Sequence, residues 1–544
     1  MKIPKSIEDR DSLYYDLIKK CTDSQDDRIE NYAFLRHYYL FGRSPDEDET
    51  PYNKIYPHID TLSAFLFASE TTKFSTHLLA DEHEIEYLRV KRINRAVNDA
   101  WLDSNADQVV SQALIWSLVY NTMLVKIIVR GSEITPFPVD PGSFGVLRED
   151  VPYTDRQEAM VHSYYTTKSQ LEMDIAAHPK RDEILEAITA SPVSTTQPDG
   201  LSRILLSATS PNVTGNVNST LQADINYIPR VSEELIKMYE LWVWNDDEND
   251  YQVVTQVDNG ITIFDRKNFF LKGEHPFIQF CPNPLYSYYW GASEVAGMTG
   301  LQKWRNERVQ QIKKLLDLQV KPPTALTGFL GLLEEKNYAS FSEGSFLATD
   351  GMQTKIERFA PDLPNDLFSV IHEIDASFAE RSGLQNILMG KGEAGVRSGR
   401  QTTELARLSS ARIKKRALVV EDALEKMATL YLKCMQKYDD REFRDDKDNP
   451  FIAEQFTHNF VVKVDAHSNS PLFVEDAKSD AAEMLQLGII TKERYIDMVN
   501  PPEKEIMRRE LKEAEAKAAA AQQAQQQQEA AKQQKEDAQK QKKD

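Results

Sequence analysis

The chain has 544 residues, of which 41% are hydrophobic and 28% charged, and its formal net charge is −20. That length allows roughly two to four domains with sizeable cores, and an acidic chain repels nucleic acid in bulk. Tight DNA binding is therefore disfavoured, although proximity to DNA is not. The three cysteines are dispersed and form no C-x-x-C pair, which argues against a disulfide framework or zinc ribbon and favours an intracellular origin.

The first part of the chain is predicted to be mainly helical. We expect helix over about the first 45 residues, an apolar helix broken near Pro57, and helix from about Asp81 to Val125. The start, MKIPKSIEDRDS, lacks the apolar stretch of a signal peptide. The apolar run VVSQALIWSLVYNTMLV (109–125) is short for a membrane span and contains polar residues, so we interpret it as a buried core helix.

β-type patterns follow. TMLVKIIVRGSEITPFPVDPGSFGVLRE is rich in β-branched residues punctuated by Pro and Gly, and Thr189–Ala223 has the composition of a long loop. IKMYELWVWNDDENDYQVVTQVDNGITIF predicts a β-meander. The acidic cluster Asp246, Asp247, Glu248 and Asp250 could suggest calcium. It lacks the sixth-position Gly and is flanked by strands, which favours a solvated hairpin tip.

Long helices dominate from Ser293 onward. The first has an apolar stripe that comprises Met298, Leu301, Val309, Ile312 and Leu316. A separate polar face comprises Lys303, Asn306, Gln310, Lys313 and Asp317. Lys321-Pro322-Pro323 ends it, and a β-like module of about 40 residues follows. A second helix begins after Pro364, with a stripe that comprises Leu367, Ile371, Ile374 and Phe378, and Gly383 is a plausible end signal.

A very long helix is predicted from about Arg400 to Tyr438. Its stripe alternates steps of four and three and comprises Ile413, Ala417, Val420, Leu424, Met427, Tyr431 and Cys434. FIAEQFTHNFVVKVDAHSNS returns to strand, and further helix follows. The Gln-, Ala- and Lys-rich end offers no apolar face to bury, which is typical of a solvated helix or a disordered tail.

A glycine loop precedes that long helix. Gly390, Gly392 and Gly395 match G-x-G-x-x-G, the dinucleotide-binding fingerprint. That motif needs a preceding strand, a following helix and an acid about 20 residues on, whereas here a helix precedes it and Lys414-Lys415 stand where the acid should be. A Walker loop fails because Gly390-Lys391 is followed by Gly392 instead of Ser or Thr. The pattern therefore indicates an exposed loop, and a plain surface hinge without a ligand remains an alternative.

Catalytic signatures are not recognisable in the sequence. H-E-x-x-H and G-x-S-x-G are absent, and the acid–histidine pair Asp465-x-His467 is interpreted as structural. We therefore predict that the chain is not an enzyme and that it binds neither a cofactor nor a metal ion.

Two stretches carry a family resemblance. NPLYSYYWGASEVAGMTGLQKWRNERVQQIKKLLDLQVKPP combines an aromatic-Gly-x-Ser turn, a Gln- and Asn-bearing helix and a Lys-Pro stop. This stretch and ERSGLQNILMGKGEAGVRSGRQTTELARLSSARIKKRALVVEDAL resemble the stem entry and the tunnel-loop region of the portal proteins of tailed bacteriophages. The resemblance rests on the order and spacing of elements from Tyr52 to Glu475, and the Gln/Ala/Lys tail departs from the family's shorter members.

The resemblance implies a helix-rich α+β fold of the portal type. In chain order its parts would be a wing (1–292), a first stem helix (293–319), a small β-type clip (320–361), a second stem helix (362–383), a tunnel loop (384–399), a long helix with return strands of the wing (400–475), a helical crown (476–510) and a low-complexity tail (511–544). The side chains expected to pack the stem are Leu301, Ile312, Leu316, Ile371 and Phe378.

The resemblance also implies a role. Such proteins form a homododecameric ring at one capsid vertex, assembled in the host cytoplasm and retained in the virion. A separate terminase drives double-stranded DNA in through the ring, the DNA later leaves through it, and head–tail adaptor or tail proteins attach to it. Terminase, adaptors, the major capsid protein and scaffolding proteins would be partners, whereas a membrane would not. Lys391, Arg397 and Arg400 would meet DNA without reading its sequence, on a loop hinged at Gly390, Gly392 and Gly395.

Two alternatives remain open. The chain could form a different ring-shaped head–tail connector that makes no direct contact with DNA. It could also be a packaging enzyme such as a terminase or nuclease, although the Walker loop that a terminase requires is missing.

Changing Lys391, Arg397 and Arg400 together to Ser should leave ring assembly intact, because an exposed loop contributes little folding energy. Each change removes a weak, salt-screened attraction for phosphate, so we expect less nuclease-protected DNA per assembled particle. Ser398→Thr in the same loop is the charge-neutral control. Full and stably retained genomes in the triple variant would leave the plain hinge interpretation.

Overall fold

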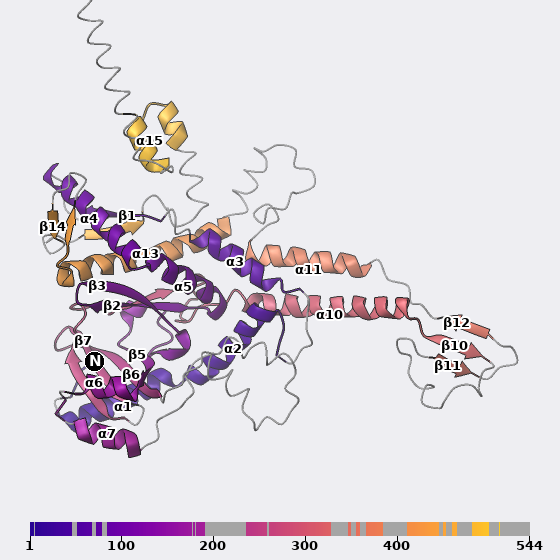
Figure 1. The fold of residues 1–544 in the computed structure, drawn as a ribbon, viewed down its shortest axis with the longest axis horizontal. Helices are drawn as coiled ribbons and strands as arrows, with labels where there is room; N and C mark the ends of the chain where they lie inside the picture. The colour runs from indigo at the N-terminus through magenta and orange to yellow at the C-terminus, as the bar shows by residue number, and fades with distance from the viewer. Residues whose placement is uncertain are drawn as a thin grey trace, which may run out of the picture.

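The computed structural model describes residues 1–4, 6–45, 52–67, 72–78, 84–176, 178–179, 181–190, 235–257, 260–327, 346–349, 355–358, 366–383, 411–444, 450–452, 460–464, 481–499, 507 and 511. The fold is α+β, as predicted. It has a broad body of helices and sheets and a long narrow arm that leaves the body on one side (Figure 1).

The body contains most of the helices. They are α1 (Ile7–Thr22), α2 (Gln25–Phe41), α3 (Ile55–Leu66), α4 (Glu84–Asp103), α5 (Ala106–Tyr120), α6 (Lys168–Asp174), α7 (Arg181–Ala190) and α13 (Ala411–Tyr438). Short 3-10 turns lie at η1 (Pro141–Ser143) and η2 (Thr154–Arg156), and α15 (Lys492–Val499) follows near the end of the described chain.

Two antiparallel sheets form the centre of the body. One has the order β3-β2-β9 and the other β4-β5-β6-β7-β8. Their strands are β2 (Met123–Arg130), β3 (Glu133–Val139), β4 (Phe144–Val146), β5 (Ala159–Thr167), β6 (Leu235–Asn245), β7 (Asp250–Val257), β8 (Thr262–Lys267) and β9 (Phe277–Phe280). Two smaller pairs, β1 (Phe74–Leu78) with β15 (Phe460–Val464) and β13 (Glu442–Arg444) with β14 (Pro450–Ile452), are also antiparallel.

A largely buried ion pair joins the two central sheets. Lys126 on β2 donates from Nζ to Glu240 Oε2 on β6 at 2.6 Å, and Trp242 Nε1 donates to the other carboxylate oxygen at 2.7 Å. Burial alone would raise the pKa of Glu240, but the charge of Lys126 lowers it below the ordinary value. Glu240 is therefore ionised and paired between the two sheets, as a largely buried charge requires.

The predicted β-meander is present as β6, β7 and β8. Asp246 at the β6–β7 turn lies 2.9 Å from the amino group of Met1. The switch to strand after the core helix is also confirmed, but it comes earlier than predicted: α5 ends at Tyr120, and residues 123–125, included in the predicted helix, belong to β2. Thr189–Ala223, interpreted as a loop, lies outside the described residues from position 191 onward.

Three helix predictions need correction. The first 45 residues form two helices that meet at Asp23-Ser24, and the helix predicted from Asp81 to Val125 is divided between α4 and α5. Asn105 has a φ of 53°, in the left-handed region that ends a helix, so the chain turns there. Pro57 does not break α3, because it occupies the first turn, where a backbone N–H has no intrahelical acceptor.

The stripe predicted on the long helix is confirmed. Ile413, Ala417, Leu424, Met427 and the rest of the stripe are buried in α13, which spans the upper side of the body and packs on α3, α4 and β15 (Figure 1). Residues 400–410, predicted as the start of this helix, lie outside the described residues.

Leu424→Ala should lower the free energy of unfolding by about 2–5 kcal/mol, because it leaves a cavity at a fully buried position of α13. Leu418→Ala on the same helix is the matched control, since Leu418 is 47% exposed and should change stability far less. Urea denaturation followed by tryptophan fluorescence measures both. Equal shifts of the two midpoints would contradict this account of α13.

Candidate functional site

The arm is the feature that distinguishes this fold. It consists of α10 (Ala296–Val320), which runs away from the body, and α11 (Asp366–Ser382), which runs back alongside it (Figure 1). At its tip lies a small sheet of order β11-β10-β12, made of β10 (Thr324–Thr327), β11 (Phe346–Thr349) and β12 (Lys355–Arg358). We call α10, α11 and this sheet the stalk.

The helices predicted over 293–319 and 362–383 match α10 and α11 within a few residues. The intervening segment contains strands, as predicted. Gly383 has a φ of 76°, a left-handed conformation that suits glycine and ends α11 where the sequence indicated.

Buried polar side chains anchor the root of α10. The Nε2 of Gln302 donates to the carbonyl of Tyr52 at 3.0 Å and to Asn306 Oδ1 at 2.7 Å, while its Oε1 accepts from the N–H of Lys54 at 3.0 Å. Asn306 Nδ2 in turn donates to the carbonyl of Gly42 at 2.8 Å. These bonds tie the stalk to the connection between α2 and α3, and they satisfy polar groups that would be costly to bury alone.

An ionic cluster joins the two stalk helices at the same level. Arg305 Nε on α10 donates to Asp375 Oδ1 on α11 at 2.8 Å, and Lys54 Nζ lies 3.0 Å from Asp375 Oδ2. Burial would raise the pKa of Asp375, but the hydrogen bonds from Lys54 and Arg305 together lower it below its ordinary 3.8. We call Arg305, Asp375, Lys54, Gln302 and Asn306 the root clamp.

The side chains predicted to pack the stem differ in burial. Phe378 is fully buried and its ring lies 5.7 Å from that of His58 on α3. Ile312 is also buried, and Leu301 and Ile371 are half-buried. Leu316, nearer the tip, is 43% exposed.

The polar face predicted on this helix needs one correction. Asn306 was expected to be solvated, but it is buried in the root clamp. Its partner, the carbonyl of Gly42, lies 264 positions earlier in the chain, so the pattern of α10 alone could not reveal it. The same is true of Gln302 and Arg305, whose burial sequence reasoning missed.

The residues predicted to meet DNA are not among those that the structure describes. Lys391, Arg397 and Arg400 and the hinge glycines Gly390, Gly392 and Gly395 lie outside the described residues, as does the pair Asp465 and His467.

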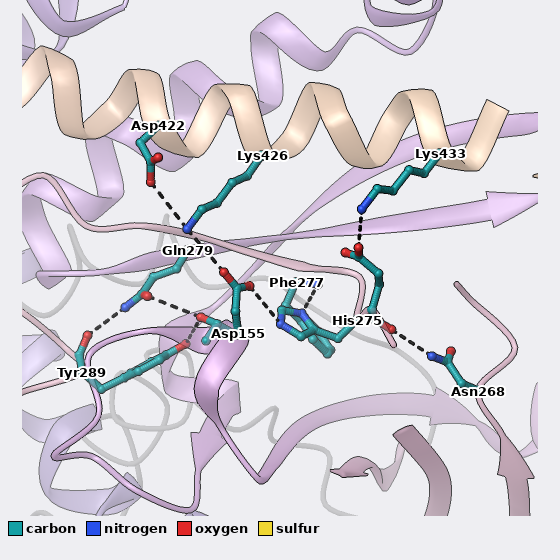
Figure 2. A network of polar contacts seen from close by, with 11 residues as sticks. Asp155, Asn268, His275, Phe277, Gln279, Tyr289, Asp422, Lys426 and Lys433 are labelled. Carbon is teal, nitrogen blue, oxygen red and sulfur yellow. Dashed lines mark hydrogen bonds and ion pairs between the residues drawn. The ribbon is translucent and has the colours of Figure 1, made fainter. Parts of the chain in front are cut away.

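A groove of about 1070 Å³ runs between α13 and the underlying strands, with β9 and β15 among its walls. Several of its charged groups pair with one another, as Figure 2 shows for Asp422, Lys426 and Lys433 of α13. Lys426 Nζ lies 3.4 Å from Asp155 Oδ2 and 3.5 Å from Asp422 Oδ2, and Lys433 contacts Glu274. The pairs with Asp155 and Glu274 connect α13 to the body, whereas Asp422 lies on α13 itself.

An acid–histidine pair lies in this groove. The N–H of Phe277 donates to His275 Nδ1 at 3.3 Å, so the ring proton is on Nε2, which faces Asp155 Oδ1 at 3.3 Å (Figure 2). The hydrogen bond from His275 lowers the pKa of Asp155 to about 2. Because both ring nitrogens are occupied, His275 has no free lone pair for general-base chemistry, and the pair acts as a structural contact between η2 and the segment that leads into β9.

Two further kinds of site are absent from the described part of the chain. It contains no group of three or more His, Cys, Asp or Glu side chains placed to hold a metal ion. None of its helices is both long and apolar enough to cross a membrane.

Comparison with known proteins identifies no family. No family model and no curated protein matches this chain. Among solved structures, a chain from a "Virion of native gene transfer agent (GTA) particle" is similar over 86% of this chain and 93% of that chain, with 9% sequence identity and a TM-score of 0.42. A likeness this distant carries no assignment of function.

Asp375→Asn should loosen the stalk at its root, because Arg305 and Lys54 lose the negative charge that they share. We expect faster hydrogen exchange of the α11 backbone amides, with Glu373→Gln, an exposed acid on the same helix, as the matched control. Because the pKa of Asp375 is lower in the folded state than its ordinary value of 3.8, the ionised carboxylate stabilises the fold at pH values above 3.8. This stabilisation is lost as the pH falls through the lower pKa of the folded state. The difference from wild type should therefore shrink in acid. An unchanged exchange rate at pH 7 would contradict the role of the root clamp.

Proposed function

We propose that this chain is the subunit of a ring-shaped portal of a tailed bacteriophage, prophage or gene transfer agent. In this proposal the ring occupies one capsid vertex of the virion. A separate terminase packages DNA through it, the DNA later leaves through it, and head–tail adaptors dock on it. The observation that carries the proposal is the stalk, a two-helix arm with a small sheet at its end.

An isolated stalk of this kind is poorly stabilised. A pair of helices buries only one stripe of each, and a sheet of three four-residue strands is near the lower limit of independent stability. Apolar side chains nonetheless remain exposed along it, among them Leu316, Val320, Phe368 and Ile356. Exposed apolar side chains that gather on one projection are typical of a protein–protein interface. Leu316 and Phe368 lie on the sides of the two helices that carry Arg305 and Asp375, so neighbouring stalks would cover chiefly Val320 and Ile356, which supports a ring.

The charge of the chain also suits a DNA conduit. A channel must not hold its cargo tightly, and a net charge of −20 opposes the counterion release that drives tight DNA binding. In the proposal, positive charge that contacts DNA is limited to the loop with Lys391, Arg397 and Arg400.

In this proposal the ATP hydrolysis that drives packaging belongs to terminase and not to this chain. The acid–histidine pair that the structure describes, Asp155 with His275, is fully engaged in structural contacts. We propose that the chain is not an enzyme and uses no cofactor, and that terminase supplies ATP hydrolysis.

The purified chain should therefore form closed rings with a central hole, visible by negative-stain microscopy and measurable by light scattering. Replacing Ile312 and Leu316 with Asp should abolish the rings, because it places charge on the apolar side of α10 that faces α11 and so disrupts the stalk on which the proposed ring depends. Circular dichroism should show that the body remains folded. Leu102→Asp, at an exposed leucine of α4, is the control.

Two outcomes would contradict the proposal. One is a wild-type monomer that hydrolyses ATP, which would favour a packaging enzyme. The other is full rings in the Ile312→Asp, Leu316→Asp variant, which would show that the stalk does not hold the ring together.

A further inference from the structure

The two stalk helices carry opposite charge. On α10 the basic residues are Lys303, Arg305, Arg308, Lys313 and Lys314 and the acidic ones Glu307 and Asp317. On α11 the acidic residues are Asp366, Glu373, Asp375 and Glu380 and the basic one Arg381. The net charge is thus +3 (5 − 2) on α10 and −3 (1 − 4) on α11, with His372 neutral.

The ion pair Arg305–Asp375 identifies the sides of the two helices that face each other within one subunit. An α-helix turns about 100° per residue, so nine positions turn a side chain by about 900°, which places it on the opposite side. Lys314 follows Arg305 by nine positions, and Asp366 precedes Asp375 by nine positions. Lys314 therefore lies on the outer edge of α10 and Asp366 on the outer edge of α11, and both are exposed.

These two residues also lie at the same level of the stalk. The helices run in opposite directions, and nine residues at about 1.5 Å each place both side chains about 13.5 Å beyond the Arg305–Asp375 pair, toward the tip. Lys313 adds a second exposed positive charge beside Lys314, and Asp317, one turn further on, is half-buried.

We propose that Lys314 of one subunit pairs with Asp366 of the next copy in the ring, and that this contact sets the axial register of neighbouring stalks. The inference rests on the proposed ring. A head-to-tail ring requires two different, complementary surfaces on each subunit, and the basic edge of α10 and the acidic edge of α11 meet that requirement. Rotation about an axis parallel to the stalk preserves height, so the two residues meet at one level.

The contact specifies register and adds little affinity. A single exposed ion pair contributes little, because water and salt screen it. Slippage of one stalk along its neighbour by two helical turns would place Lys314 about 10.5 Å away, opposite Glu373 on the same edge of α11. The root clamp fixes each stalk to its own body, so this slippage also requires the bodies to shift.

Disulfide trapping in the assembled full-length chain tests the inference. The double variant Lys314→Cys, Asp366→Cys should give, on mild oxidation of rings, a ladder of linked subunits on a non-reducing denaturing gel. The two positions lie on opposite edges of one stalk, beyond the reach of an intrachain disulfide, so linked species report contact between copies. Each single variant and the wild type, whose Cys21 and Cys434 are buried, measure the background.

The register is tested by a second double variant, Lys314→Cys with Glu373→Cys, which should give little of the ladder. Rings of the Lys314→Cys, Asp366→Cys variant that give no ladder, or equal ladders from the two double variants, would overturn the inference while leaving the ring proposal intact. A wild-type chain that never forms rings would overturn the proposed function itself.

Discussion

The root clamp is the interaction on which the arrangement of this molecule depends. A two-helix arm has little apolar surface with which to hold itself at a fixed angle, so its orientation must be set where it leaves the body. Gln302 and Asn306 bind main-chain groups of the α2–α3 connection, and Arg305 and Lys54 share Asp375. These bonds have directions, whereas apolar packing alone would permit α10 to rotate or slide.

Behind the clamp, the body is organised so that its elements cannot move independently. α13 crosses the upper side and buries one complete stripe against α3, α4 and β15. Its exposed side is fastened through Lys426 and Lys433 to acids of the groove, and the Lys126–Glu240 pair joins the two central sheets. Force applied along the stalk would thus be transmitted to a body with several ionic and apolar connections, as the channel subunit that we propose would require.

The same architecture separates two kinds of charge. In the body and at the root, ionic groups are paired within one subunit, as Asp155, Glu274 and Asp375 illustrate. Along the outer edges of the stalk, Lys314 and Asp366 are exposed and point away from each other. A protein that assembles in a ring would use the first set to fold and the second to align its copies.

The sequence by itself determined those features that depend on local periodicity. The alternating spacing of Ile413 to Cys434 predicts the buried stripe of α13, the meander around Asp246 follows from two β-branched runs, and Gly383 ends α11, because each signal is contained within one element. Only the tertiary structure decided that Asn306 and Gln302 are buried, that Asp155 meets His275, and that Pro57 leaves α3 unbroken. The partners of the first three lie more than 100 positions away, and a polar residue on a helix has the same appearance in sequence whether water or a distant carbonyl satisfies it.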